Sequence, residues 1–185
     1  MASVKASLLI LSLAAALLPC PARAAPDRVS ALDSGPKHSS GGWKEGHRGH
    51  LWHDQTFTLA AGSLAYVLKY RACIDPSHPG VRAVEEGCLG MPAPSMANWY
   101  HSGFFTLTVN GNDVGLEPLV DLRVTESGTR GACHLVWETA DAVVRVQFLL
   151  MPGSDRLLCQ ALWSAKAGAK IETVSARFTC YPSFF

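Results

Sequence analysis

The stretch Val143–Ala165, VVRVQFLLMPGSDRLLCQALWSA, predicts an antiparallel hairpin. In its first half, apolar side chains alternate with Arg145 and Gln147, which is the period of two expected for a strand with one buried face. Pro152 cannot donate a ladder hydrogen bond and Gly153 tolerates a positive φ, so the turn is expected between the two halves. Because leucines occupy both faces, we expect a central strand pair whose second half buries four side chains on one face: Leu157, Cys159, Ala161 and Trp163.

The rest of the chain predicts more antiparallel sheet around this hairpin. Phe105–Val109 alternates and is followed by Asn110-Gly111, the strongest short hairpin signal. Short alternating runs separated by turn residues, with no helical stripe, predict an all-β fold, an antiparallel β-sandwich. Two further strands are expected at Gln55–Leu59 and Leu64–Tyr70. The following stretch, Cys73–Pro94, is expected to be a long irregular loop.

The N-terminus predicts export. Lys5 precedes the apolar run Leu8–Leu18, which is too short to cross a bilayer, and Ala22-Arg23-Ala24 then provides a cleavage site. We therefore expect a signal peptide over 1–24, a secreted or periplasmic protein, and no stable membrane insertion after cleavage. A lipoprotein attached through Cys20 is the alternative. Residues 25–55 are polar and rich in glycine and serine, which predicts a flexible leader before a domain spanning 56–185.

The charge balance argues against nucleic acid as a partner. The signal segment holds Lys5 and Arg23 and no acidic residue, so the 16 basic and 15 acidic residues of the whole chain become 14 and 15, a net charge of −1. No basic field remains that would attract a polyanion over long range.

The cysteines suit an oxidising compartment. Cys73 and Cys88 flank a loop that contains proline and glycine, so they are the predicted disulfide, and closing such a loop stabilises by roughly 3 kcal/mol. Cys133, Cys159 and Cys180 lie on apolar strand faces, where a free thiol behaves as a small hydrophobe. No C-x-x-C motif is present, so a zinc ribbon or a thioredoxin-type site has no support.

Three histidines form the densest group of potential metal ligands: His47, His50 and His53. Imidazole suits zinc, copper or nickel, but a spacing of three residues requires a helix to share one face. Gly46 and Gly49 disfavour that helix. A metal site and a solvated segment leading into the first strand both remain open, and no cofactor is predicted.

The stretch Asn98, Trp99, Tyr100 and His101 is the predicted ligand-binding site. Adjacent aromatic residues on an extended chain point in opposite directions, so at least one ring is expected at the surface or over a sheet edge. Exposed rings stack on sugars, and the flanking Asn and His can bind hydroxyl groups. The competing interpretation is that both rings cover the end of the sandwich.

Catalysis has little support. No G-x-S-x-G elbow or phosphate-binding glycine loop is present. Five carboxylates lie in turns or on polar strand faces, which predicts solvated surface charge rather than a catalytic pair: Glu117, Asp121, Glu126, Glu138 and Asp141.

The stretch from Phe104–Gly111, FFTLTVNG, through Cys180-Tyr181-Pro182 resembles the sheet core of secreted bacterial mutarotase-like β-sandwich (supersandwich) domains. The resemblance covers less than half of the chain and rests on strand rhythm and turns, so no catalytic residue is transferred. It implies an association with carbohydrate. It also implies that the chain is short for a complete domain of this type, an incomplete supersandwich, with Phe184-Phe185 directly after a core strand.

The sequence is therefore compatible with three functions. The first is an exported, non-catalytic β-sandwich that binds carbohydrate or a cell-envelope polymer. The second is the N-terminal fragment of an enzyme acting on polysaccharide. The third is an exported protein that binds a metal through its histidines.

Overall fold

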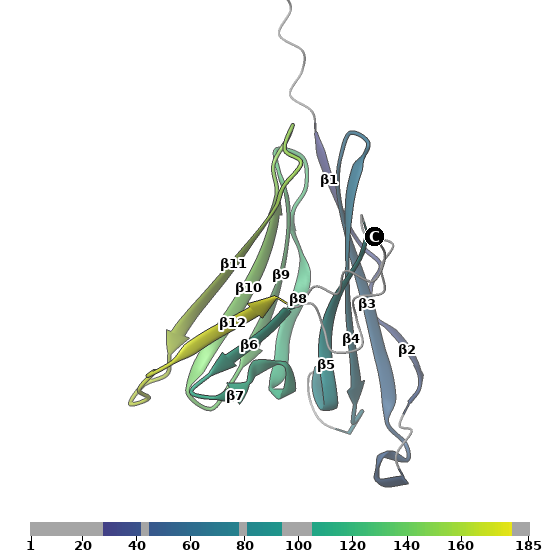
Figure 1. Ribbon diagram of the computed structural model, residues 1–185. Coiled ribbons are helices and arrows are strands. Elements are labelled where there is room, and N and C mark those ends of the chain that lie inside the picture. The colour runs from purple at the N-terminus through teal and green to yellow at the C-terminus, as the bar shows by residue number, and fades with distance from the viewer. Residues whose placement is uncertain (1–27, 42–44, 78–80, 94–104, 179–185) are drawn as a thin grey trace, which may run out of the picture.

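The computed structural model describes residues 28–41, 45–77, 81–93 and 105–178, and it confirms the predicted all-β, antiparallel fold. Figure 1 shows two layers of strands that approach each other at one end of the molecule and diverge at the other. The first layer contains β1 (Val29–Asp33), β2 (Lys37–Ser40), β3 (Leu51–Ala61), β4 (Leu64–Ile74) and β5 (Val81–Ala93). The second layer contains β8 (Pro118–Glu126), β9 (Gly131–Glu138), β10 (Ala142–Leu150) and β11 (Leu157–Ala165).

A ribbon of short strands continues from the first layer and crosses in front of the second (Figure 1). It consists of β6 (Phe105–Val109), β7 (Asn112–Asp113) and β12 (Val174–Phe178), with β12 paired to β6. Strand β5 pairs with β6 through Leu89 and Phe105, and its other end pairs with β8 through Val81 and Leu119. The two layers are thus parts of one curled sheet in the order β1-β3-β4-β5-β8-β9-β10-β11.

Helix is limited to two 3-10 turns in the described chain, η1 (Glu45–His47) and η2 (Val114–Leu116). Neither has the length or the apolar run needed to cross a membrane.

The core lies between the layers and follows the alternation of the strands. On the second layer, cross-strand pairs such as Trp137 and Val144 point toward the first layer. Buried side chains of the first layer meet them, and the ring of Tyr70 lies edge-on to Trp137 with centroids 6.4 Å apart. Cys133 is fully buried in this core, as predicted.

The hairpin of β10 and β11 has the predicted register but not the predicted place in the sheet. Leu150 pairs with Leu157 and Ala142 with Ala165, so the turn lies at Pro152-Gly153. However, β11 is the last strand of the order given above, and it is not the inner member of a central pair. The prediction that Cys159 and Trp163 are core residues is wrong, because both are exposed on this edge strand, which in the described chain pairs with β10 alone.

Two segments predicted to be irregular form strands. The predicted leader contains β1 and β2, which pair with β3, and Val29 and Ala31 of β1 are buried. The predicted loop after Cys73 contains β5, which pairs with β4 over a register interrupted by two irregularities. Those interruptions, together with Gly87, Gly90 and Pro92, hide the alternation that identifies a strand in sequence.

Candidate binding face

The predicted ligand-binding residues Asn98, Trp99, Tyr100 and His101 lie outside the described residues. In the sequence they lie between two described strands, because β5 ends at Ala93 and β6 begins at Phe105. Both strands belong to the part of the sheet where the first layer continues into the ribbon.

Of the three predicted metal ligands, the structure describes the side chains of two, His50 and His53. His53 lies in β3 with its side chain in the core, whereas His50 precedes β3 and its Nε2 is 4.0 Å from an oxygen of Asp75. The side chain of His47 lies outside the description. Among the described side chains, no group of three His, Cys, Asp or Glu residues is arranged to hold a metal ion.

His53 has a partner that was not predicted from the sequence. His38 in β2 pairs directly with His53, and its Nε2 is 3.1 Å from His53 Nδ1. Burial lowers the pKa of His53, and the nearby His38 lowers it further, while the Gln55 side chain and the charge of Asp54 act in the opposite direction. The pairing of these two histidines depends on the register of β2 on β3, for which the sequence offers no local signal.

Polar groups also occur deeper in the core. Gln55 donates hydrogen bonds to both carboxylate oxygens of Asp33 at 2.9 Å. His53 Nε2 and Trp137 Nε1 are buried without a hydrogen-bond partner. The side chains of His53, Gln55 and Trp137 are buried, whereas Asp33 lies at the exposed end of β1.

The thiols are poorly suited to nucleophilic chemistry. Burial raises the pKa of Cys133 to about 12, with smaller contributions from Asp33 and Cys159. Cys159 is exposed as a residue, but partial burial raises its pKa to about 11. Both are free thiols in the structure and stay protonated at neutral pH, so neither provides the thiolate that a cysteine nucleophile requires.

The predicted Cys73–Cys88 disulfide remains a prediction. Cys73 is buried in β4, and the neighbouring β5 places Cys88 opposite Arg71. The two backbones are therefore adjacent at this point of the sheet. The side chain of Cys88 lies outside the described residues.

Most of the candidate catalytic carboxylates have structural partners. Asp121 contacts His134 Nε2 at 2.8 Å and Arg123 at 3.2 Å. Glu126 pairs with Arg130, Glu138 with Lys166, and Asp141 accepts a hydrogen bond from Asn110. Glu117 instead forms the C-cap of η2. Carboxylates held in this way stabilise turns and strand edges.

One open hollow of about 380 Å³ lies beside the end of β4, lined by Asp75, Arg82, Ala83, Val84 and Leu116. It combines one carboxylate with one guanidinium group.

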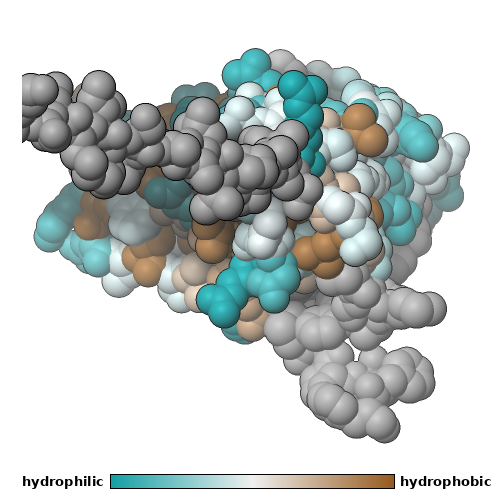
Figure 2. Space-filling view, turned by 90° about the horizontal axis from the view of Figure 1, so that it is seen from above, coloured by the Kyte–Doolittle hydropathy of each residue, from teal (hydrophilic) through white to brown (hydrophobic). Residues whose placement is uncertain are grey.

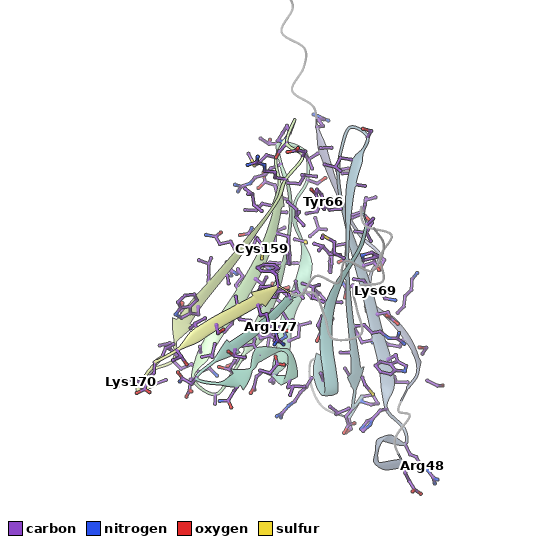
Figure 3. The ribbon with its side chains drawn as sticks, viewed as in Figure 1. Arg48, Tyr66, Lys69, Cys159, Lys170 and Arg177 are labelled. Atoms are coloured by element: carbon purple, nitrogen blue, oxygen red, sulfur yellow. The ribbon has the colours of Figure 1, made fainter. Side chains whose placement is uncertain are left out.

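The outer face of the first layer gathers an aromatic ring and several charges. Trp52 and Asp54 point outward from β3, and Lys69 and Arg71 point outward from β4. The guanidinium of Arg71 lies 4.4 Å above the Trp52 ring. Asp54 is 2.9 Å from Lys69 and 3.7 Å from Arg71, and Figure 3 shows Lys69 on the side of β4 that faces away from the second layer.

This group, which we call the outer face, carries a local positive charge. Lys37 of β2 lies opposite Asp54 and on the same side of the sheet, so this face carries three cationic side chains and one carboxylate. The adjacent strands hold these groups on a surface whose partly exposed indole is already stacked with a cation. The arrangement can bind an extended anionic ligand by charge and by contact with the ring.

Comparison with known proteins gives no assignment. No protein family matches the chain, and neither the curated proteins nor the solved structures contain a match.

Proposed function

We propose that the protein is an exported, non-catalytic β-sandwich protein that binds an acidic carbohydrate or cell-envelope polymer. The observation that carries this proposal is the outer face, where Arg71 lies over the Trp52 ring and, together with Lys69, contacts Asp54. Guanidinium groups bind carboxylate and phosphate groups with paired hydrogen bonds, and rings provide a surface for sugar stacking. The chemistry therefore favours a polymer that combines sugar rings with negative charges.

The predicted Asn98–His101 stretch fits the same function. It adds two aromatic residues, Trp99 and Tyr100, between β5 and β6 in the sequence, close in the chain to the strand that pairs with β4. Export of the protein, predicted from its N-terminus, would bring both regions into contact with envelope polymers.

The first experiment is a glycan-array screen of the purified protein with neutral and acidic glycans, followed by calorimetric titration of the best ligand. Arg71→Glu is expected to weaken binding of the acidic ligand by roughly 10- to 100-fold, because a hydrogen bond to a charged group contributes about 1.5–3 kcal/mol. The expected binding also weakens as salt is raised.

Arg123→Glu is the matched control, since Arg123 is an exposed arginine that lies beside an aspartate on β8 of the second layer. It should leave binding unchanged. Equal binding by wild type and Arg71→Glu would remove the outer face from the proposal. Loss of binding only in a Trp99→Ala/Tyr100→Ala variant would instead locate the site in the predicted stretch, and absence of binding to every acidic and neutral polymer would contradict the function itself.

A further inference from the structure

Strand β11 forms an open edge of the sheet. It pairs with β10 through nine consecutive residue pairs, from Leu157 to Ala165, without an irregularity. In the described part of the chain no strand pairs with its other side. Among the described residues, the backbone groups on that side therefore have no strand partner over the whole length of β11.

This edge lacks the features that usually prevent strands from pairing between molecules. The sequence of β11, LLCQALWSA, contains no charged residue and no proline, and the strand has no bulge. The other edges are different. Strand β12 has five residues and includes Arg177, and β1 is short and tied by Val29 to Gly128 at the turn between β8 and β9.

Both faces of β11 are also apolar and exposed. Leu158 and Leu162 are 51% and 43% exposed on the outer face, and Trp163 is 48% exposed on the face that continues the core. On the side of the molecule where β10, β11 and β12 lie, hydrophobic surface appears among hydrophilic residues in Figure 2. An uncovered tryptophan beside a free strand edge favours addition of a strand.

We propose that β11 pairs antiparallel with β11 of a second copy of this chain, about a two-fold axis at Gln160. This register places Leu157 opposite the partner's Trp163 and Leu158 opposite the partner's Leu162. Cys159 then faces the partner's Ala161, and the two Gln160 side chains meet at the axis. Within residues 157–163, each apolar side chain lies opposite an apolar side chain of the partner. Gln160 is the polar residue of this segment, and it lies opposite Gln160 of the partner, so the two amides can exchange hydrogen bonds.

The charges at the strand ends select this register and favour a second copy. An axis at Ala161 would place Arg156 opposite the partner's Lys166, and like charges directly opposite each other are destabilising. With the axis at Gln160, Arg156 faces the partner's Ser164 and Asp155 lies one position from the partner's Lys166. Isologous pairing also joins the two second layers into one continuous sheet and covers each Trp163 with the other chain.

The oligomeric state tests the proposal directly. Sedimentation velocity of the wild-type protein over a concentration series is expected to show a reversible monomer–dimer equilibrium. Leu158→Lys/Leu162→Lys is expected to give a monomer, because it places four lysines around the axis. Val120→Lys is the matched control, since Val120 is 52% exposed on β8, and it should leave the dimer intact.

Cross-linking tests the register. Residues opposite each other on antiparallel strands have Cα atoms roughly 4.5–5.5 Å apart, within disulfide range. In a Cys159→Ser background, Gln160→Cys is therefore expected to form a disulfide-linked dimer under mild oxidation, visible by non-reducing electrophoresis. Ser164→Cys in the same background should not, because its counterpart lies several residues further along the partner strand.

A monomer at every concentration would overturn the proposal. So would cross-linking of Gln160→Cys that is no more efficient than that of Ser164→Cys. If hydrogen exchange showed β11 protected in a monomer, a segment of the same chain would occupy the edge, which also contradicts pairing with a second copy.

Discussion

His53 is a buried histidine whose ring interacts with a second histidine. Its Nδ1 is 3.1 Å from His38 Nε2, and its Nε2 has no partner in the core. A hydrogen bond between two imidazoles needs one N–H group and one lone pair, so it is lost when both rings are protonated. The pKa of His53 is lowered mainly by burial, which means that the folded protein resists protonation of this ring.

A lowered pKa in the folded state makes stability depend on pH in one direction. Below the ordinary histidine pKa of about 6.5, the unfolded chain binds a proton that folded His53 does not, so the free energy of unfolding decreases as the pH falls. This contribution is complete at neutral pH and is lost as the pH falls from about 6.5 through the folded pKa. One such proton contributes up to about 1.4 kcal/mol per pH unit.

We predict that denaturant unfolding will show wild-type stability decreasing between pH 7.5 and pH 5.5, and that His53→Gln will show a shallower decrease. His50→Gln is the control, since His50 lies before β3 and outside the pair. Equal pH dependence in wild type and His53→Gln would show that protonation of other groups causes the loss.

At the scale of elements, one asparagine organises the hairpin that joins β6 and β7. Asn110 has a φ of 51° and precedes Gly111 with a φ of 83°, as the predicted Asn-Gly turn requires. Its side-chain nitrogen donates to Asp141 and to the carbonyl of Lys170, and its oxygen accepts from the backbone of Glu172 and Thr173. The turn therefore anchors the segment that leads into β12.

We predict that Asn110→Ala destabilises the protein by about 2–3 kcal/mol in denaturant unfolding. The variant loses several hydrogen bonds and places alanine in the left-handed region, which asparagine tolerates better. Asn112→Ala, two positions along in β7, is the control and should change stability by less than about 0.5 kcal/mol. A similar loss in both variants would mean that the hydrogen bonds to the segment before β12 contribute little.

The sequence predicts elements well where alternation and turn chemistry agree. Asn110-Gly111 and Pro152-Gly153 mark turns that the structure contains, and the hairpin of β10 and β11 has its expected register. Strand β5 was missed because its pairing with β4 is irregular. Two other features depend on which strands pair and in which register: the position of β11 at the sheet edge and the contact between His38 and His53. The alternation of side chains along one strand does not specify its neighbours in the sheet.

At the scale of the whole molecule, the layers are joined where they converge. Tyr66 of β4 donates a hydrogen bond to the carbonyl of Asp155 in the turn between β10 and β11. On the other side, the backbone of Val29 exchanges hydrogen bonds with Gly128, and Ala31 donates to Ser127. Strand β1, from the predicted leader, is therefore one of the elements that close the sandwich.

The side chain of Val29 completes this closure. It is 1% exposed, and it approaches Gly131 so closely that a Cβ added there would lie 2.6 Å from its Cγ1. Val29→Asp would bury an unpaired carboxylate, so we expect a loss of about 3 kcal/mol or more in the free energy of unfolding, measured by denaturant titration. Leu32→Asp is the matched control, because Leu32 lies on the same strand but is 64% exposed, and it should change stability by less than about 0.5 kcal/mol. A Val29→Asp variant as stable as Leu32→Asp would show that β1 is dispensable and that the sandwich closes without it.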